Sequence, residues 1–292
     1  MGDAPALLLV GHGSRSRDGV AEYWRLAEVL RACAPALEVG CGFIELSEPD
    51  LDTSIDDLVQ RGAASVVAVP LVLLGAGHLK TDGPAAMARA RLRHPHTSLH
   101  YAAHLGVHPS MLALAEERIR AALSEGEPSE TSVVLVGRGS SDPDANADLF
   151  KVARLLWDGR GLRGIEASFV SLASPSVPDA MERCRLLGAR RIVVAPYFLF
   201  TGILVDRIRE QAGKWAQDHE SYGIEVAHAD YLGPVEPVAR LVLERYREAV
   251  EGEAAMNCDC CIYRVPLPGY EHQVGAPVIS HHGTHSQHTH AQ

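Results

Sequence analysis

Short apolar runs alternate with amphipathic stretches along most of the chain. The first run, at positions 7–10, is Leu-Leu-Leu-Val and ends in Gly-His-Gly-Ser, which predicts a buried strand, a loop and then a helix from about Gly19. Further strands are predicted at 37–44, 65–73 and 98–103, and helices at 51–60, 84–93 and 109–123. Strands separated by helices indicate an α/β fold with a parallel sheet flanked by helices.

The same pattern occurs a second time, after an offset of 126 residues. Four scaffold positions repeat at that offset: Gly11 and Gly137, Pro49 and Pro175, Gly62 and Gly188, Pro70 and Pro196. The sequence therefore predicts two tandem domains related by internal duplication, at 1–124 and 132–250. A polar stretch at 125–131 is the expected linker, and a Cys/His-rich tail occupies 251–292.

The two copies keep their packing residues but differ in their reactive ones. His12 corresponds to Arg138, Glu45 to Ser171, and His78 to Leu204. All three differences fall at or just after the predicted carboxyl ends of strands, where ligands bind in open α/β sheets. This pattern favours a single metal or proton-transfer site in the first domain. The alternatives are an ordinary loop histidine at His12 and neutral drift at three exposed loop positions.

Two imidazoles and a carboxylate suit a divalent metal ion that must be passed on. Neutral imidazole binds Co(II), Ni(II), Fe(II) and Zn(II), and two such ligands leave coordination positions open. Glu45 could complete the coordination or accept protons as a general base. Cationic and hydroxyl groups near the same loops, among them Ser14, Arg15, Lys80 and Arg138, could bind carboxylates. Together they indicate a polyanionic small molecule that chelates metal.

Composition narrows the class of protein further. The formal net charge of −10 offers no basic surface for nucleic acid. Neither a signal peptide nor an apolar run long enough to span a membrane is found, so a cytoplasmic location without membrane association is expected. The sequence does not indicate the oligomeric state.

Three motifs, in order, resemble one known family. VGHGSR at 10–15, GFIELSEP at 42–49 and VPLVLLGAGHLKTD at 69–82 are similar to the CbiX-type sirohydrochlorin chelatases, the ATP-independent class II chelatases. The resemblance spans roughly 5–250 and implies metal insertion into sirohydrochlorin, a tetrapyrrole. It implies that His12 and His78 hold the metal and that Glu45 assists, which makes all three catalytic. The remaining implied contacts are with the substrate, from Gly13, Ser14, Arg15, Gly77 and Lys80. Arg138 of the second copy is expected to bind substrate carboxylates as a nearby cation. The second domain is expected to close the cleft without supplying metal ligands.

The tail contains a cluster of thiols and a histidine-rich end. Cys258, Cys260 and Cys261 lie in a segment with an MxCxxC pattern, which in the long cobaltochelatases is a proposed iron–sulfur site. A four-iron cluster normally takes four cysteines, so a complete site would need a further ligand. Zinc or nickel capture by the same residues is the competing interpretation.

Three functions remain open on the sequence alone. The first is a sirohydrochlorin cobaltochelatase that serves cobalamin synthesis, with Co(II) as the expected metal and Fe(II) or Ni(II) as alternatives. The second is a sirohydrochlorin ferrochelatase that serves siroheme synthesis, because ligand type alone does not separate Co(II) from Fe(II). The third is a metal-binding protein or metallochaperone without tetrapyrrole turnover.

Overall fold

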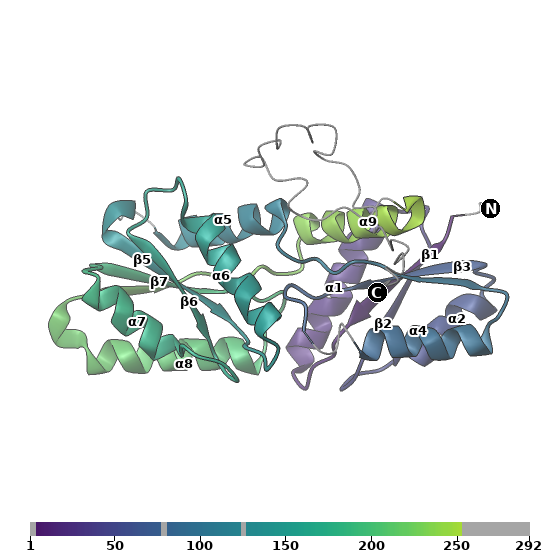
Figure 1. The fold of residues 1–292 in the computed structure, drawn as a ribbon, viewed down its shortest axis with the longest axis horizontal. Helices are drawn as coiled ribbons and strands as arrows, with labels where there is room; N and C mark the ends of the chain where they lie inside the picture. Colours follow the sequence, from purple (N-terminus) through teal and green to yellow (C-terminus); the bar gives the residue numbers. More distant parts are fainter. Residues whose placement is uncertain (1–3, 77–80, 124–126, 253–292) are drawn as a thin grey trace, which may run out of the picture.

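The fold contains two parallel four-stranded sheets flanked by helices, as the alternating pattern predicts (Figure 1). The computed structural model describes residues 4–76, 81–123 and 127–252. The first sheet has the order β2-β1-β3-β4 and the second the order β6-β5-β7-β8. The strands are β1 Ala6–Gly11, β2 Val39–Phe43, β3 Ser65–Pro70, β4 Ser98–Tyr101, β5 Thr131–Gly137, β6 Gly164–Phe169, β7 Arg191–Pro196 and β8 Glu225–His228.

A helix follows each of the described strands, as is usual where parallel strands are joined by crossover connections. The helices are α1 Arg17–Cys33, α2 Leu51–Gln60, α4 Asp82–Arg93, α5 Pro109–Leu123, α6 Pro143–Trp157, α7 Val177–Leu186, α8 Ile203–Asp218 and α9 Glu236–Glu251, with short 3₁₀ helices at Pro128–Glu130 and Glu220–Tyr222. The predicted elements of the first half are confirmed, with shifted ends. The first helix begins at Arg17 because Ser16 caps it by accepting a hydrogen bond from Gly19 N–H at 3.4 Å.

Strands β1 and β5, which occupy equivalent inner positions in the two sheets, are buried on both faces. All six residues of β1 and all seven of β5 are buried, because helices cover each sheet from both sides. One apolar cluster joins the halves and contains Leu7 and Leu9 of β1 together with Val133 and Leu135 of β5. The two halves therefore share a continuous core in addition to separate clusters on their other faces.

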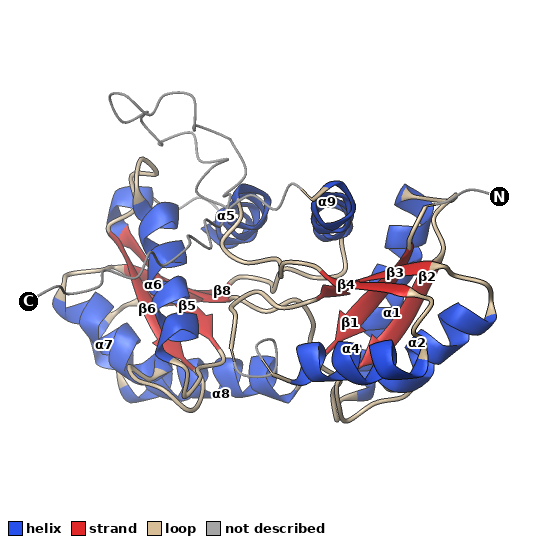
Figure 2. Cartoon of the chain, turned by 45° about the vertical axis from the view of Figure 1, so that its right-hand side comes forward, coloured by secondary structure: helices blue, strands red, loops and turns tan. Residues whose placement is uncertain are grey.

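The last helix of each sequence repeat packs on the opposite half. Helix α5 contacts α6, β7 and β8, whereas α9 contacts α1 and β3 (Figure 2). Each of these two helices also donates a side-chain hydrogen bond to the half on which it packs. Arg118 of α5 donates to Leu232 O at 3.3 Å, and Arg245 of α9 donates to Leu105 O at 3.1 Å. The domain boundaries at 124 and 132 remain predictions from the sequence. In the structure, the chain passes from the first half to the second after β4, and returns to the first half after β8.

The duplication extends to unusual backbone conformations. Gly13 and Gly139 have φ of 93° and 87°, and Leu46 and Leu172 both have φ of 63°. A Cβ added at Gly13 would lie 1.8 Å from the carbonyl oxygen of Glu45, and one at Gly139 would lie 1.9 Å from that of Ser171. The loop after the first strand of each sheet can therefore touch the loop after the second strand only with glycine at this position.

Among the helices that the structure describes, none is both long enough and apolar enough to cross a bilayer.

We expect Gly139→Ala to cost considerably more stability than Gly159→Ala. Both glycines have positive φ, but a Cβ on Gly159 would meet nothing within 4 Å. Gly159→Ala should lower the free energy of unfolding by about 1 kcal/mol, and Gly139→Ala by about 3 kcal/mol or more, since the second loop must also move. Urea unfolding of both variants measures the difference. Equal losses would show that the loop contact has no steric role.

Candidate metal site

The first sheet brings two of the predicted site residues together at its carboxyl edge. Strand β1 pairs in register with β2 as far as Gly11 opposite Phe43, and with β3 as far as Val10 opposite Pro70. The loops that follow these strands therefore start from the same edge of the sheet. His12 comes directly after β1, and Glu45 follows two residues after β2.

The imidazole of His12 faces the carboxylate of Glu45. His12 Nε2 lies 3.6 Å from Glu45 Oε1, and the side chains are 29% and 45% exposed, respectively. Two ligand atoms of a tetrahedral ion with bonds of about 2.1 Å lie roughly 3.4 Å apart, so this separation fits a shared metal ion after a small adjustment. Both side chains are partly exposed, although the Nε2 atom of His12 is itself buried.

Backbone contacts fix the two loops against each other. Glu45 N–H donates to His12 O at 3.0 Å, directly beside the close approach of Gly13 to the Glu45 carbonyl. Ser47 Oγ accepts from Ser14 N–H at 3.1 Å and lies 3.3 Å from Ser14 O, to which it donates. Main-chain bonds between the two loops thus help to set the relative position of the imidazole and the carboxylate.

The loop of Gly13, Ser14 and Arg15 leads into the N-terminus of α1. Ser14 Oγ accepts from Ser16 N–H at 3.0 Å, while Arg15 is exposed. Free N–H groups and the helix dipole make such an N-terminus favourable for negative charge. Substrate contacts by Gly13, Ser14 and Arg15 remain predictions.

The second half carries the same loop without the reactive pair. Arg138 follows β5 as His12 follows β1, and its carbonyl accepts a 3.0 Å hydrogen bond from Ser171 Oγ. Arg138 is exposed and therefore accessible to a ligand, and its contact with substrate stays a prediction. A serine and an arginine in these loops offer neither an imidazole nor a carboxylate for metal binding.

Several predicted site residues lie outside the described residues. They are Gly77, His78 and Lys80 in the first half, and Cys258, Cys260 and Cys261 in the tail. Within the described ranges, no group of three or more His, Cys, Asp or Glu residues is arranged to hold a metal ion. His12 and Glu45 therefore supply the part of the predicted site that can be described, and the contributions of the others remain predictions.

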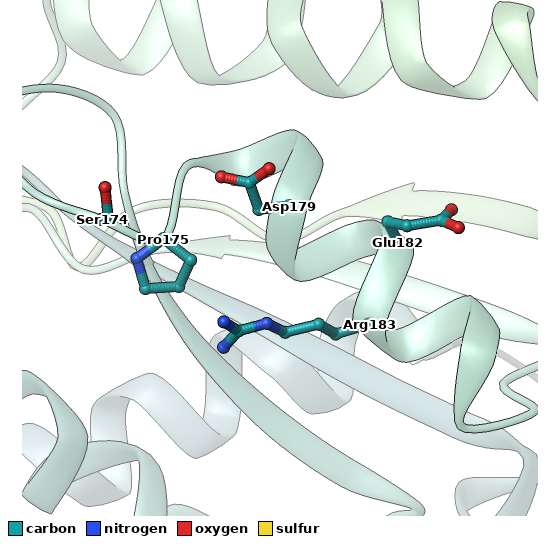
Figure 3. Close-up of a pocket in the computed structure, with 5 residues that line it drawn as sticks. All are labelled: Ser174, Pro175, Asp179, Glu182 and Arg183. Carbon is teal, nitrogen blue, oxygen red and sulfur yellow. The ribbon is translucent and has the colours of Figure 1, made fainter.

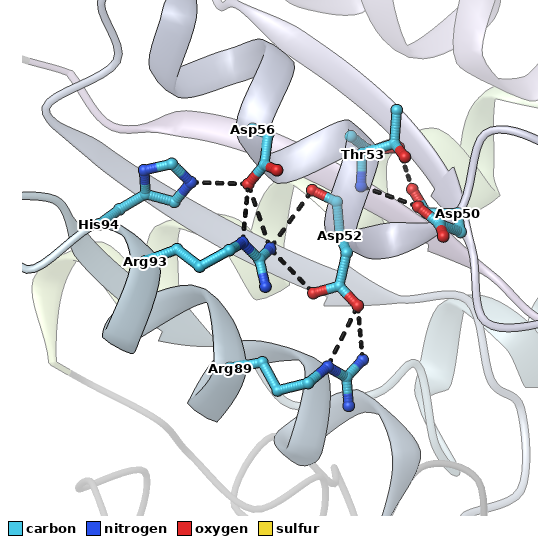
Figure 4. Close-up of polar contacts among 8 residues, drawn as sticks. Asp50, Asp52, Thr53, Asp56, Arg89, Arg93 and His94 are labelled. Atoms are coloured by element: carbon cyan, nitrogen blue, oxygen red, sulfur yellow. Dashed lines mark hydrogen bonds and ion pairs between the residues drawn. The ribbon is translucent and has the colours of Figure 1, made fainter.

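A polar network between α2 and α4 was not anticipated from the sequence. It links α2, which follows the Glu45 loop, to α4, which begins four residues after His78 in the chain (Figure 4). Asp52 pairs with Arg89 at 2.7 Å and with Arg93 at 2.8 Å, and Asp56 lies 2.6 Å from His94 Nε2. Burial raises the pKa of Asp52, but hydrogen bonds from Arg89 and Arg93 outweigh it and leave that pKa lowered. The network keeps the two helices in fixed relation.

Sequence reasoning also missed a buried carboxylate, that of Glu22. It lies on the buried face of α1 with Tyr23 and Leu26, and it is only 5% exposed. The available signal was its position: a glutamate four residues before Leu26 falls on the apolar side of the helix, where a charged group needs partners. Its partners come from the second half of the chain.

A hollow of about 420 Å³ lies elsewhere, in the second half (Figure 3). It is lined by Ser174, Pro175, Asp179, Glu182 and Arg183, from the loop after β6 and from α7. None of the predicted site residues lines it, and Asp179 is occupied in the capping box of α7. This hollow is not part of the candidate metal site.

Comparisons with known proteins agree with this arrangement. The sirohydrochlorin cobaltochelatase of Priestia megaterium is 37% identical over 272 residues, which cover 90% of this chain and 85% of that protein. The sirohydrochlorin ferrochelatase of Bacillus subtilis is 30% identical over 258 residues, covering 87% of this chain and 95% of that protein.

Solved structures show the same fold. SirB from Bacillus subtilis with Fe3+ matches with a TM-score of 0.75 and 29% identity, covering 86% of this chain and 98% of that one. The sirohydrochlorin chelatase SirB from Bacillus subtilis subspecies spizizenii in complex with cobalt matches with a TM-score of 0.71 at the same identity, covering 85% and 96% of the two chains. The family model named CbiX matches twice, over residues 6–122 and 132–249, once for each half. The chain belongs to the CbiX family.

Proposed function

We propose that this CbiX-family chelatase, a lyase that inserts a metal ion into a tetrapyrrole, acts without ATP on sirohydrochlorin with Co(II) as its metal. The observation that carries the choice of cobalt is the 37% identity to a cobaltochelatase across 90% of the chain, against 30% to a ferrochelatase across 87%. The adjacent imidazole and carboxylate of His12 and Glu45 support the chemistry.

The proposed reaction exchanges one divalent ion for two protons. His12, together with His78, holds the incoming ion, which is a substrate of the reaction. As the ion enters the macrocycle, two pyrrole N–H protons leave, and Glu45 accepts them in turn and passes them to water. The side chain of Glu45 is 45% exposed, so its carboxylate is in contact with solvent. Glu45 Oε1 lies 3.6 Å from His12 Nε2, so the proposed proton acceptor is next to the proposed metal ligand.

Insertion of iron is the second candidate. A ferrochelatase relative at 30% identity and a homologous structure with Fe3+ favour it, and imidazole and carboxylate ligands accept either metal. A metallochaperone would bind the ion tightly and leave the macrocycle metal-free. Incubating the pure protein anaerobically with sirohydrochlorin and Co(II), Fe(II) or Ni(II), while following the absorbance of the macrocycle, separates the three. The largest kcat/KM with Co(II) is expected; absence of insertion with every metal would reject the chelatase assignment.

Replacement of the proposed metal ligands should separate binding from proton transfer. His12→Ala and His78→Ala should reduce insertion by at least about a hundredfold, since each removes a ligand while the fold remains intact. Glu45→Gln keeps the shape but not the basicity, so we expect Co(II) still to bind while kcat falls about a hundredfold or more. Calorimetric titration with Co(II) and single-turnover absorbance measure the two effects. Turnover like that of the wild type in either histidine variant would contradict the role of both histidines as metal ligands.

The tail should be dispensable for the chemical step. Metal insertion involves no net electron transfer, so an iron–sulfur centre at Cys258, Cys260 and Cys261 has no role in it, whether the tail binds such a cluster or Zn(II) or Ni(II). Truncation after Glu251 should preserve kcat at saturating Co(II). Activity at limiting Co(II) should fall if the terminal histidines raise the local concentration of the ion. A truncated protein that is folded but inactive at saturating Co(II) would place the tail in catalysis or assembly.

A further inference from the structure

The carboxylate of Glu22 joins the site-bearing half to the second half. One oxygen, Oε2, accepts a hydrogen bond from Thr201 N–H at 2.7 Å, and the other, Oε1, accepts one from the hydroxyl of Tyr231. Arg25 Nη2 also lies 3.9 Å from Oε1. Thr201 lies in the loop between β7 and α8, and Tyr231 in the crossing between β8 and α9. A single buried carboxylate thus holds two separate segments of the second half.

The segment held by Glu22 rests on the first turn of α1. A Cβ added at Gly19 would lie 2.8 Å from Thr201 O, and one at Gly202 would lie 3.6 Å from Ser16 Cβ. The ring of Phe200 packs edge-on against Tyr23, with the ring centroids 6.4 Å apart. Backbone therefore touches backbone at this point, which leaves little freedom for the first turn of α1 to shift.

That first turn is continuous with the candidate metal site. Ser16 caps α1, and Ser14 Oγ accepts from Ser16 N–H at 3.0 Å. Ser14 is in turn bonded to Ser47 of the Glu45 loop through N–H at 3.1 Å. Ser14 lies two residues after His12 in the same loop. The segment that Glu22 contacts is therefore connected to the His12 loop through Ser16 and Ser14.

The residues at this contact differ between the two sequence copies. At the 126-residue offset, Glu22 corresponds to Asp148, a shorter acid that is partly exposed, and Thr201 corresponds to Gly75. The longer, buried acid occurs in the half that carries His12 and Glu45. Burial and the hydrogen bond to Glu22 raise the pKa of Tyr231 to about 12, so its hydroxyl remains a donor at neutral pH.

We propose that Glu22 is a positioning residue for the reaction: it fixes the loop at 200–202 of the second half on the first turn of α1 and so holds the loop of His12–Ser16 in its working geometry. The inference rests on the proposed chelatase function. It gives the second half, which lacks the reactive pair, a specific part in catalysis. Misplacement of a catalytic loop by about 1 Å can lower a rate a hundredfold, so a contact outside the reacting groups can control turnover.

Variants of Glu22 test the proposal, with Glu28 as a matched control. Glu28 lies on the same helix but is exposed. Glu22→Ala should lower kcat/KM for sirohydrochlorin at least about tenfold, mainly through kcat, at a temperature where circular dichroism shows the protein folded. Glu22→Gln can still accept from Thr201 N–H and can donate to the Tyr231 oxygen, so it should remain within about threefold of the wild type. Glu28→Ala should match the wild type.

Hydrogen exchange supplies a readout that does not depend on turnover. Amides at 13–19 should exchange at least about tenfold faster in Glu22→Ala, with those of β5 unchanged, because only the local contact is lost. Tyr231→Phe removes one of the two bonds and should give an intermediate effect, which keeps the test decisive if Glu22→Ala fails to fold. Unchanged kinetics and exchange in Tyr231→Phe and Glu22→Ala would overturn the proposal. Lack of insertion by the wild type would instead reject the proposed function, while the exchange data would still report on the contact.

Discussion

The parallel register of β1 with its two neighbours is the constraint on which the site depends. Because β1 pairs with β2 and β3 at matching carboxyl ends, the loops that carry His12 and Glu45 leave the sheet side by side. Gly13 then allows the first loop to approach the Glu45 carbonyl more closely than any side chain would permit. The geometry of the reactive pair follows from backbone pairing and from one missing Cβ. Backbone geometry thus brings the two side chains to the same edge of the sheet.

The two halves share the same backbone scaffold but differ in the side chains at the positions of the reactive pair. The second half has the same strand order, the same left-handed glycine and the same left-handed leucine as the first. Where the first half has His12 and Glu45, the second has Arg138 and Ser171, which form a side chain to backbone hydrogen bond instead. A scaffold held by backbone bonds tolerates such replacements, since no packed side chain has to move. The second half therefore keeps the same fold without the pair of His12 and Glu45.

The second half nevertheless remains tied to the first at many points. Its last helix, α9, packs against α1 and β3, and in exchange α5 packs against the second sheet. The apolar cluster that contains both β1 and β5 adds to this connection. Charged groups complete it: the buried Arg245 binds the carbonyls of His104 and Leu105, and the buried Glu22 binds Thr201 and Tyr231. Separating the halves would break the hydrogen bonds of both groups, which makes separation costly.

The sequence by itself determined the class of fold, the duplication, the order of the elements and the loops that carry the candidate site. These features are local or periodic: apolar runs, capping residues and an offset of 126 residues are visible without any knowledge of packing. It also indicated His12 and Glu45, because their counterparts in the second copy differ in chemistry. Only the tertiary structure decided that α5 and α9 exchange places, that Glu22 belongs to the boundary between the halves, and that Asp52 and Asp56 join α2 to α4. These contacts link residues far apart in the chain, and the partner of a charged side chain at such separations is set by how the helices pack, which no local pattern records.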